Sequence, residues 1–189
     1  MLTAELRIVG VRPLLWHVFG ADAIPLEKRE RTGVAGNDPI EWTRTFLMTA
    51  ERQLYFPPAY LFSCLRDASK FTKKGKGSIQ SSVGATLQVL DELLVDRFVP
   101  EEPCYDQNQD VYIHVSSVRN PVTKARNVRY RIATKAGWRI CCRIVWNPTV
   151  VSRGEMEAVA HDAGQLVGLG SGRAIGFGRF EVESFAVGA

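Results

Sequence analysis

The chain lacks any long apolar run. No stretch approaches the roughly 18 consecutive apolar residues that a membrane-spanning helix needs. The first residues, Met1 to Arg7, also lack the basic segment followed by an apolar segment that marks a signal peptide. We therefore expect a protein of the cytoplasm that makes no contact with a membrane.

Metal and nucleotide motifs are missing as well. The four cysteines contain no C-x-x-C pair, and the three histidines (His17, His114, His161) are not at zinc-ligand spacing from them. No G-x-x-x-x-G-K-[ST] motif occurs. The sequence thus indicates no metal and no cofactor. We expect reduced structural thiols, with Cys64 buried on a helix and with Cys141 and Cys142 on opposite faces of a strand.

Acidic residues are absent from residues 111–154. This stretch holds nine basic residues, in a chain whose formal net charge is only +4: Arg119, Lys124, Arg126, Arg129, Arg131, Lys135, Arg139, Arg143 and Arg153. Alternation with Tyr130 and Ile132 predicts that Arg129 and Arg131 share one face of a strand, with Arg126 close to them. Arginine binds phosphate through two N–H groups, and neighbouring aromatic rings can stack on unpaired bases. The alternative is a basic, solvated hairpin without a partner.

Glycine, in contrast, is concentrated near the end of the chain. Five of these residues lie between 168 and 178: Gly168, Gly170, Gly172, Gly176 and Gly178. Such a loop can present successive N–H groups to an anion, and Arg173 and Arg179 add positive charge beside it. The alternative is a tight helix-to-strand connection that begins with a glycine cap. Because a helix precedes the loop and a strand follows it, the order is the reverse of a dinucleotide-binding fold.

A second basic segment covers residues 70–78. It contains four lysines, two glycines and no acidic residue. Lys73, Lys74 and Lys76 are candidate phosphate contacts, although the segment can equally be a solvated loop.

The periodicity of apolar residues predicts a βαββαβ order. We expect strands at 3–11, within 84–99, at 137–146 and at 180–185, and helices at 59–71 and after Ser152, where Glu155 completes a capping box. The expected apolar face of the second helix is Met156, Val159, Ala160, Ala163, Leu166 and Val167. This is an α+β fold of ferredoxin-like type, in which two helices cover an antiparallel sheet. We expect one domain over residues 1–189, with insertions at about 13–56 and 97–136; the second insertion includes two further strands, at 111–118 and 129–134.

Two motifs on this framework resemble the RAMP superfamily, the RNA-binding proteins of CRISPR systems. One is the helix entered through Tyr55-Phe56-Pro57-Pro58-Ala59 and continuing to Leu65-Arg66-Asp67-Ala68; the other is the glycine loop ending in Gly176-Phe177-Gly178-Arg179-Phe180. The resemblance implies a subunit of antiviral defence that coats guide RNA, with other effector-complex subunits or further copies of itself as partners. The basic insertion lies where those backbone subunits carry a thumb-like hairpin. The chain is also similar to phage and prophage proteins, so a CRISPR role does not follow from the fold alone.

The same resemblance leaves an enzymatic alternative open. Related repeat-processing endoribonucleases are metal-independent and use a histidine as general base, which makes His17 the candidate here. Some backbone subunits cut RNA with an aspartate after the first strand, which would correspond to Asp22 or Asp38. We favour a non-catalytic protein that binds single-stranded RNA, or else single-stranded DNA, because no helix has the basic character of a duplex-reading helix. A protein-interaction module, such as a phage-encoded inhibitor, is the third hypothesis.

Overall fold

The computed structural model describes residues 1–18, 38–119, 122, 124 and 126–188. Its main sheet has the strand order β12-β1-β11-β8-β4-β3, and β7 also pairs with β11. The bounds are β1 Leu2–Gly10, β3 Leu47–Met48, β4 Gln53–Phe56, β7 Gln88–Val89, β8 Leu93–Phe98, β11 Arg139–Trp146 and β12 Phe180–Val187. Every pairing is antiparallel. The α+β class is confirmed, and the order of the four predicted strands, β12-β1-β11-β8, is compatible with a ferredoxin-like core.

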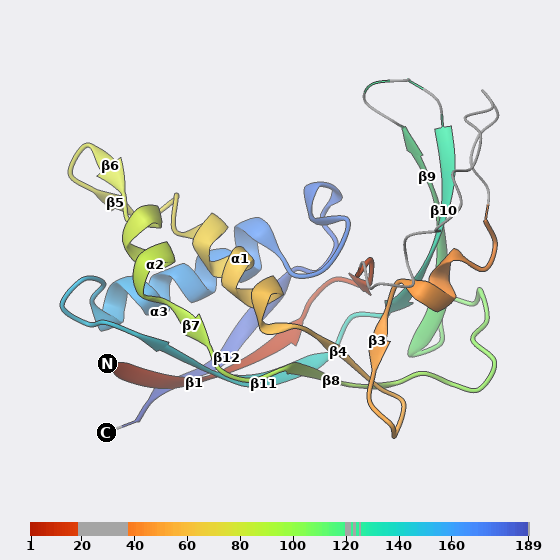
Figure 1. Ribbon diagram of the computed structural model, residues 1–189, viewed down its shortest axis with the longest axis horizontal. Coiled ribbons are helices and arrows are strands. Elements are labelled where there is room, and N and C mark those ends of the chain that lie inside the picture. The colour runs from red at the N-terminus through yellow and green to blue at the C-terminus, as the bar shows by residue number, and fades with distance from the viewer. Residues whose placement is uncertain (19–37, 120–121, 123, 125, 189) are drawn as a thin grey trace.

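Helices cover one face of this sheet (Figure 1). They are α1 (Pro58–Ala68), α2 (Gln80–Thr86) and α3 (Arg153–Asp162). The core forms between these helices and the inward residues of the strands, which alternate with exposed residues as predicted for β11: Ile140, Cys142, Ile144 and Trp146 are buried. The expected capping box is present, because Ser152 Oγ accepts a hydrogen bond from the Glu155 N–H and Glu155 accepts one from the Ser152 N–H.

A second sheet of three strands stands at one end of the molecule (Figure 1). Its order is β2-β10-β9, with bounds Leu14–Leu15, Arg126–Thr134 and Val111–Arg119. The strands come from the two ranges that the sequence marks as insertions. The short helix η2 (Glu41–Arg44) packs beside β10. Trp16, which follows β2, is stacked on Phe56 with ring centroids 4.6 Å apart, so the base of this sheet is anchored in the main core. The single-domain organisation stays a prediction.

The last helix departs from the sequence prediction at its end. Residues Ala163–Val167 form a π-helical turn, η3, in which the Gly168 N–H donates to the Ala163 carbonyl. A π-helical turn is wider than an α-helical one, so the residues that follow it are rotated away from the apolar face of α3. Leu166 is consequently 45% exposed, and its predicted place on the apolar face is wrong. Gly164 permits this packing, since a Cβ there would lie 2.1 Å from the Phe180 carbonyl oxygen.

Two other segments are more structured than the sequence indicates. Helix α2 occupies a polar stretch with a glycine in its middle, and it is held by Ile79, Val83 and Leu87, which are buried at helical spacing. The lysine-rich segment is a small hairpin, β5 (Lys73–Lys74) with β6 (Gly77–Ser78). The strand predicted within residues 84–99 is present as β7 and β8.

Over the part of the chain that the structure describes, no helix is long and apolar enough to cross a bilayer. The cysteines are placed as expected. Cys64 and Cys142 are buried, while Cys104 and Cys141 are exposed, and all four are free thiols.

Candidate nucleic-acid interface

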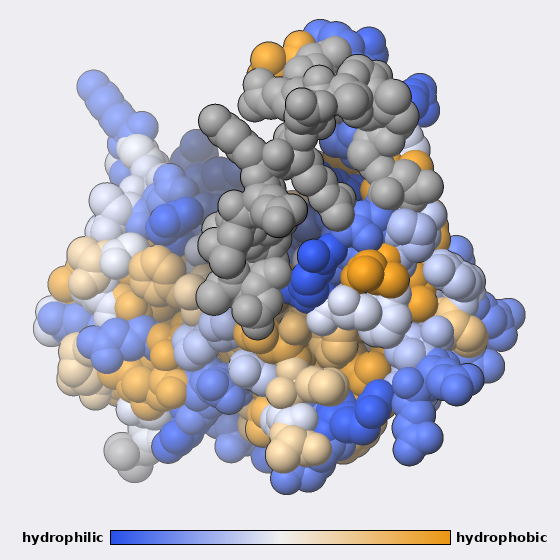
Figure 2. Space-filling model, turned by 45° about the vertical axis from the view of Figure 1, so that its right-hand side comes forward, coloured by the Kyte–Doolittle hydropathy of each residue, from blue (hydrophilic) through white to orange (hydrophobic). Residues whose placement is uncertain are grey.

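The β9–β10 hairpin carries arginines on both of its faces. In the antiparallel register Arg126 lies opposite Arg119, and Arg129 lies opposite Ser116. Arg129 and Arg131 therefore share a face, as predicted, whereas Arg126 lies on the opposite face. Arg119 and Arg126 are exposed, and neither has an ion-pair partner among the described residues. Figure 2, in which this end of the molecule comes forward, shows mainly hydrophilic surface here with small apolar spots.

Tertiary structure neutralises part of the basic stretch. Arg139 pairs with Glu183 and Arg143 with Asp91 on the sheet face away from the helices, and Lys135 pairs with Asp110. Arg129 pairs with Glu41 of η2, which also accepts a hydrogen bond from the Tyr130 backbone N–H. Although residues 111–154 contain no acidic residue, the fold thus brings acidic residues from other segments next to them. The positive charge that remains is concentrated on the hairpin.

A row of three polar side chains crosses the hairpin sheet near its base. His114 lies opposite Arg131 in the β9–β10 ladder. The pairing of β2 with β10 continues one residue further, because the Trp16 N–H donates to the Ile132 carbonyl. This places His17, the next residue, on the other side of Arg131. Arg131 is 9% exposed. Burial lowers the pKa of both histidines, and the Arg131 charge lowers both further. Both effects favour the neutral form of the two imidazoles.

The predicted catalytic candidates have different surroundings. His17 is partly buried, and its carbonyl accepts a 3.4 Å hydrogen bond from the Tyr60 hydroxyl of α1. Glu41 raises the pKa of His17, but burial and the charge of Arg131 lower it by more. Asp38 pairs with Arg44 at 2.5 Å. Asp22 lies outside the described residues.

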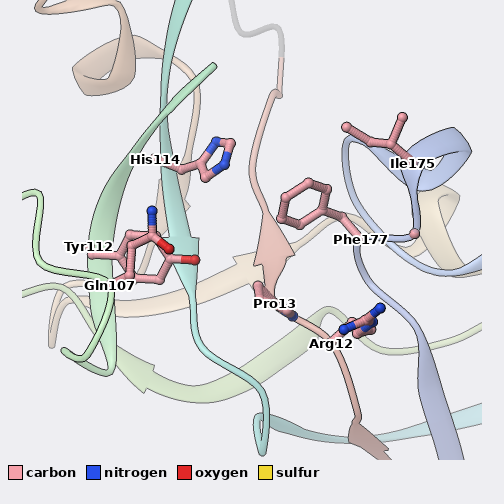
Figure 3. Close-up of a pocket in the computed structure, with 8 residues that line it drawn as sticks. Arg12, Pro13, Gln107, Tyr112, His114, Ile175 and Phe177 are labelled. Atoms are coloured by element: carbon pink, nitrogen blue, oxygen red, sulfur yellow. The ribbon is translucent and has the colours of Figure 1, made fainter. Parts of the chain in front are cut away.

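The glycine loop faces the hairpin through one aromatic ring. Phe177 makes an edge contact with His114, with ring centroids 5.2 Å apart, and it packs on the buried cluster of Leu15, Tyr112 and Ala133. Beside these residues is a pocket of about 300 Å³, also lined by Arg12, Pro13, Gln107, Ile175 and Gly176. Figure 3 shows the His114 ring of β9 and the Phe177 ring of the glycine loop turned toward each other.

Most of the predicted glycine nest is used inside the protein. Seven amide groups of the loop donate to backbone carbonyls: those of Gly168, Leu169, Ser171, Ile175, Gly176, Phe177 and Gly178. The close approach of the chain also explains individual glycines. A Cβ at Gly170, for example, would lie 2.6 Å from the Leu15 carbonyl oxygen, whereas at Gly176 it would meet nothing within 4 Å. The tight-connection interpretation therefore accounts for most of the loop, and Gly176 is the position whose left-handed backbone no contact explains.

The remaining predicted contacts lie in separate places. Arg173, in η4 (Arg173–Ile175), is 3.5 Å from Asp67 and lines a smaller pocket with Tyr60, Ser63 and Gly170. Arg179 lines the pocket on the other side of Arg12, with Gly164 and Phe180. Lys73, Lys74 and Lys76 lie on β5–β6 and its turn, at the opposite end of the molecule from β9–β10 (Figure 1), and Lys74 is 3.9 Å from Glu155. The lysines therefore do not join the hairpin in one site.

Three residues of this region were not singled out by the sequence as binding residues: His114, Ser116 and Phe177. The signal for the first two was the alternation along 111–118, which places both on one strand face. What that face contacts depends on the glycine loop and on β2, which are distant in sequence.

The fold is similar, over almost the whole chain, to that of a chain in a solved structure. It is a chain in the cryo-EM structure of the type III-B Cmr-beta complex bound to cognate target RNA, with a TM-score of 0.53 and 10% sequence identity. The match covers 98% of this chain and 60% of that chain. No protein-family model matches the sequence, and no curated protein matches it either. At this identity the similarity shows the fold alone.

Proposed function

We propose that the protein binds single-stranded RNA through the β9–β10 hairpin and the glycine loop that faces it, as a RAMP-like subunit of a CRISPR-type assembly. The observation that carries the proposal is the exposed pair Arg119 and Arg126. The two lie directly opposite each other in the ladder, without an ion-pair partner among the described residues. Like charges in this arrangement repel each other, and a phosphate backbone relieves the repulsion.

Two further observations support RNA as the ligand. On the side of the hairpin that faces the glycine loop, β10 carries Arg129, which also pairs with Glu41, and the loop contributes the partly exposed ring of Phe177. A guanidinium with an aromatic ring suits a phosphate backbone with unstacked bases. The fold also matches a chain from a complex that holds target RNA. The three described helices pack on the sheet, so none projects as a duplex-reading helix (Figure 1).

The test is the binding of labelled single-stranded RNA, single-stranded DNA and duplex across a salt series. We expect tight RNA binding that weakens steeply as salt rises, because phosphate contacts release counterions. Equal affinity for duplex, or no binding at low salt, would contradict the proposal. Binding of an acidic protein that single-stranded oligonucleotides do not displace would favour the interaction module.

A second function, metal-independent RNA cleavage, has one specific observation in its favour. His17 has a lowered pKa next to Arg131, and a neutral imidazole beside a cation can accept a proton while the cation stabilises the phosphate. The same RNA is therefore run on a denaturing gel after incubation with EDTA. Cleavage that disappears in His17→Ala would establish the nuclease, and intact RNA would leave the binder.

A further inference from the structure

Three polar atoms on one face of the hairpin are buried without a hydrogen-bond partner among the described residues. They are Nδ1 of His114, Oγ of Ser116 and Nε of Arg131. His114 is opposite Arg131 in the ladder, and Ser116 is two residues further along the same face. Cβ atoms of opposed residues are about 5 Å apart and those of diagonal neighbours about 8 Å, within reach of an arginine side chain. The three residues therefore occupy neighbouring positions on one face of the hairpin.

Such a cluster is unfavourable unless a ligand completes it. Buried polar groups in proteins almost always have a partner, and an unpartnered guanidinium N–H is a costly exception. Glu41 is the carboxylate whose charge acts on Arg131, but its oxygens bond Arg129 and the Tyr130 backbone N–H. Arg131 thus has no ion-pair partner among the described residues.

The chemistry of the three atoms selects the ligand. Arginine Nε–H and serine O–H both donate, and histidine Nδ1 donates in one tautomer or when protonated. Several donors around one fixed positive charge match an anion with several acceptor oxygens. His114, one of the three, also lines the 300 Å³ pocket together with Tyr112 and Phe177 (Figure 3), and this pocket has room for the group to which such an anion is attached.

We propose that His114, Ser116 and Arg131 form a binding site for a single phosphate group, with the attached nucleoside or ester directed into the pocket beside Phe177. For an RNA phosphate this rests on the proposed function; a free phosphate ester would bind through the same three donors. The site is distinct from the exposed Arg119 and Arg126 pair, which lies on the other face of the hairpin.

The first experiment measures thermal unfolding of the full chain with inorganic phosphate, against sodium chloride at equal ionic strength. The variants are Ser116→Ala and, as a matched control, Ser117→Ala, which alters an exposed serine on the opposite face. We expect phosphate to raise the Tm of the wild type and of Ser117→Ala, because a ligand of the folded state stabilises it. In Ser116→Ala the shift should largely disappear.

The same variant tests whether the hydroxyl is unpartnered. Removing an unsatisfied buried hydroxyl does not destabilise the free protein, so without phosphate Ser116→Ala should unfold at the same temperature as the wild type or a higher one. A lower Tm without phosphate would show that Ser116 already has a partner and would overturn the site. A phosphate shift as large in Ser116→Ala as in the wild type would overturn it too.

The second experiment separates the two sources of phosphate. A short single-stranded RNA is titrated onto the wild type, Ser116→Ala and Arg131→Met. We expect Arg131→Met to bind the RNA roughly tenfold more weakly, because it loses a charge-assisted contact. Weaker RNA binding in both variants assigns the site to an RNA phosphate. Unchanged RNA binding together with a Ser116-dependent phosphate shift assigns it to a free phosphate ester.

The remaining outcomes distinguish the site from the function. Normal RNA binding by all variants without any phosphate shift would overturn the site and leave the RNA-binding proposal standing. A wild type that binds neither RNA nor phosphate would overturn both. Should Arg131→Met fail to fold, Ser116→Ala alone decides, since it removes a single hydroxyl.

Discussion

Arg119 and Arg126 lie directly opposite each other where the two strands of the β9–β10 hairpin reach their far end. Both side chains are exposed, and the described residues supply no acid to either of them. Two arginines of the same acid-free stretch, in contrast, pair with acids from distant segments: Arg139 with Glu183 and Arg143 with Asp91. An uncompensated pair at this position is a feature of a surface that meets an anion rather than of one that stabilises the folded chain.

Replacing both arginines of this pair by alanine should weaken RNA binding without loss of stability. Each phosphate contact to a single strand contributes about 0.7 to the slope of log K against log salt, so the slope should fall by roughly 1.4 in the double variant. Fluorescence anisotropy across a salt series measures this. The control is Arg7→Ala, which removes an arginine paired with Glu5 on the sheet face away from the helices. An equal loss in the control would contradict a specific role for the hairpin.

The lysine hairpin provides a second comparison. Lys73, Lys74 and Lys76 lie at the opposite end of the molecule from Arg119 (Figure 1), so one short oligonucleotide held by the β9–β10 hairpin is not expected to contact them. Changing all three lysines to glutamine should leave the affinity for a short RNA nearly unchanged and weaken only the binding of a longer one. Equal losses with both RNA lengths would place the short RNA on the lysines instead.

Stability should fall as the pH falls through the range of histidine titration. The fold lowers the pKa of His17 and His114, mainly through burial and then through the charge of Arg131. Below the unfolded pKa of about 6.5 the unfolded chain therefore binds more protons than the folded one, so protonation favours unfolding. Urea unfolding at pH 7.5, 6.5 and 5.5 measures the change. The double variant His17→Asn with His114→Asn should show a smaller decrease; an unchanged decrease would assign the effect to other groups.

Two glycines of the loop should differ sharply in their tolerance of alanine. A Cβ at Gly178 would lie 1.8 Å from the Leu169 carbonyl oxygen, and the backbone there has a φ of +69°. Gly178→Ala should therefore cost at least about 3 kcal/mol, from overpacking added to strain. Gly176 has a φ of +92° but open space around its Cβ position, so Gly176→Ala should cost only about 1–2 kcal/mol. Chemical denaturation of both variants checks the order, and similar losses would contradict the packing explanation.

Thiol labelling should separate the cysteines into two pairs. Cys104 and Cys141 are exposed, whereas Cys64 and Cys142 are buried, and burial raises the pKa of each buried thiol to about 12. Because the thiolate is the reactive form, two thiols should react with a disulfide reagent in the native protein and four after unfolding. Rapid labelling of four thiols under native conditions would show that the core opens on the timescale of the assay.

The sequence by itself determined the elements whose signals are local. The alternation along residues 137–146, the prolines at the start of α1 and the Ser152–Glu155 capping box each act through neighbours a few residues away, and each predicted its element. The βαββαβ order followed from these elements, because short connections between them leave few arrangements of an antiparallel sheet.

Only the tertiary structure decided which charges stay uncompensated and which polar atoms are left without a partner. Glu41 pairs with Arg129 across 88 residues, and Glu183 pairs with Arg139 across 44. Most of the glycine loop serves close packing against β2 and Phe177, and the same packing brings Phe177 against His114. Periodicity reports which residues share a face, but the partner of that face comes from segments far along the chain. The charge and the hydrogen bonds of the site are therefore properties of the assembled fold.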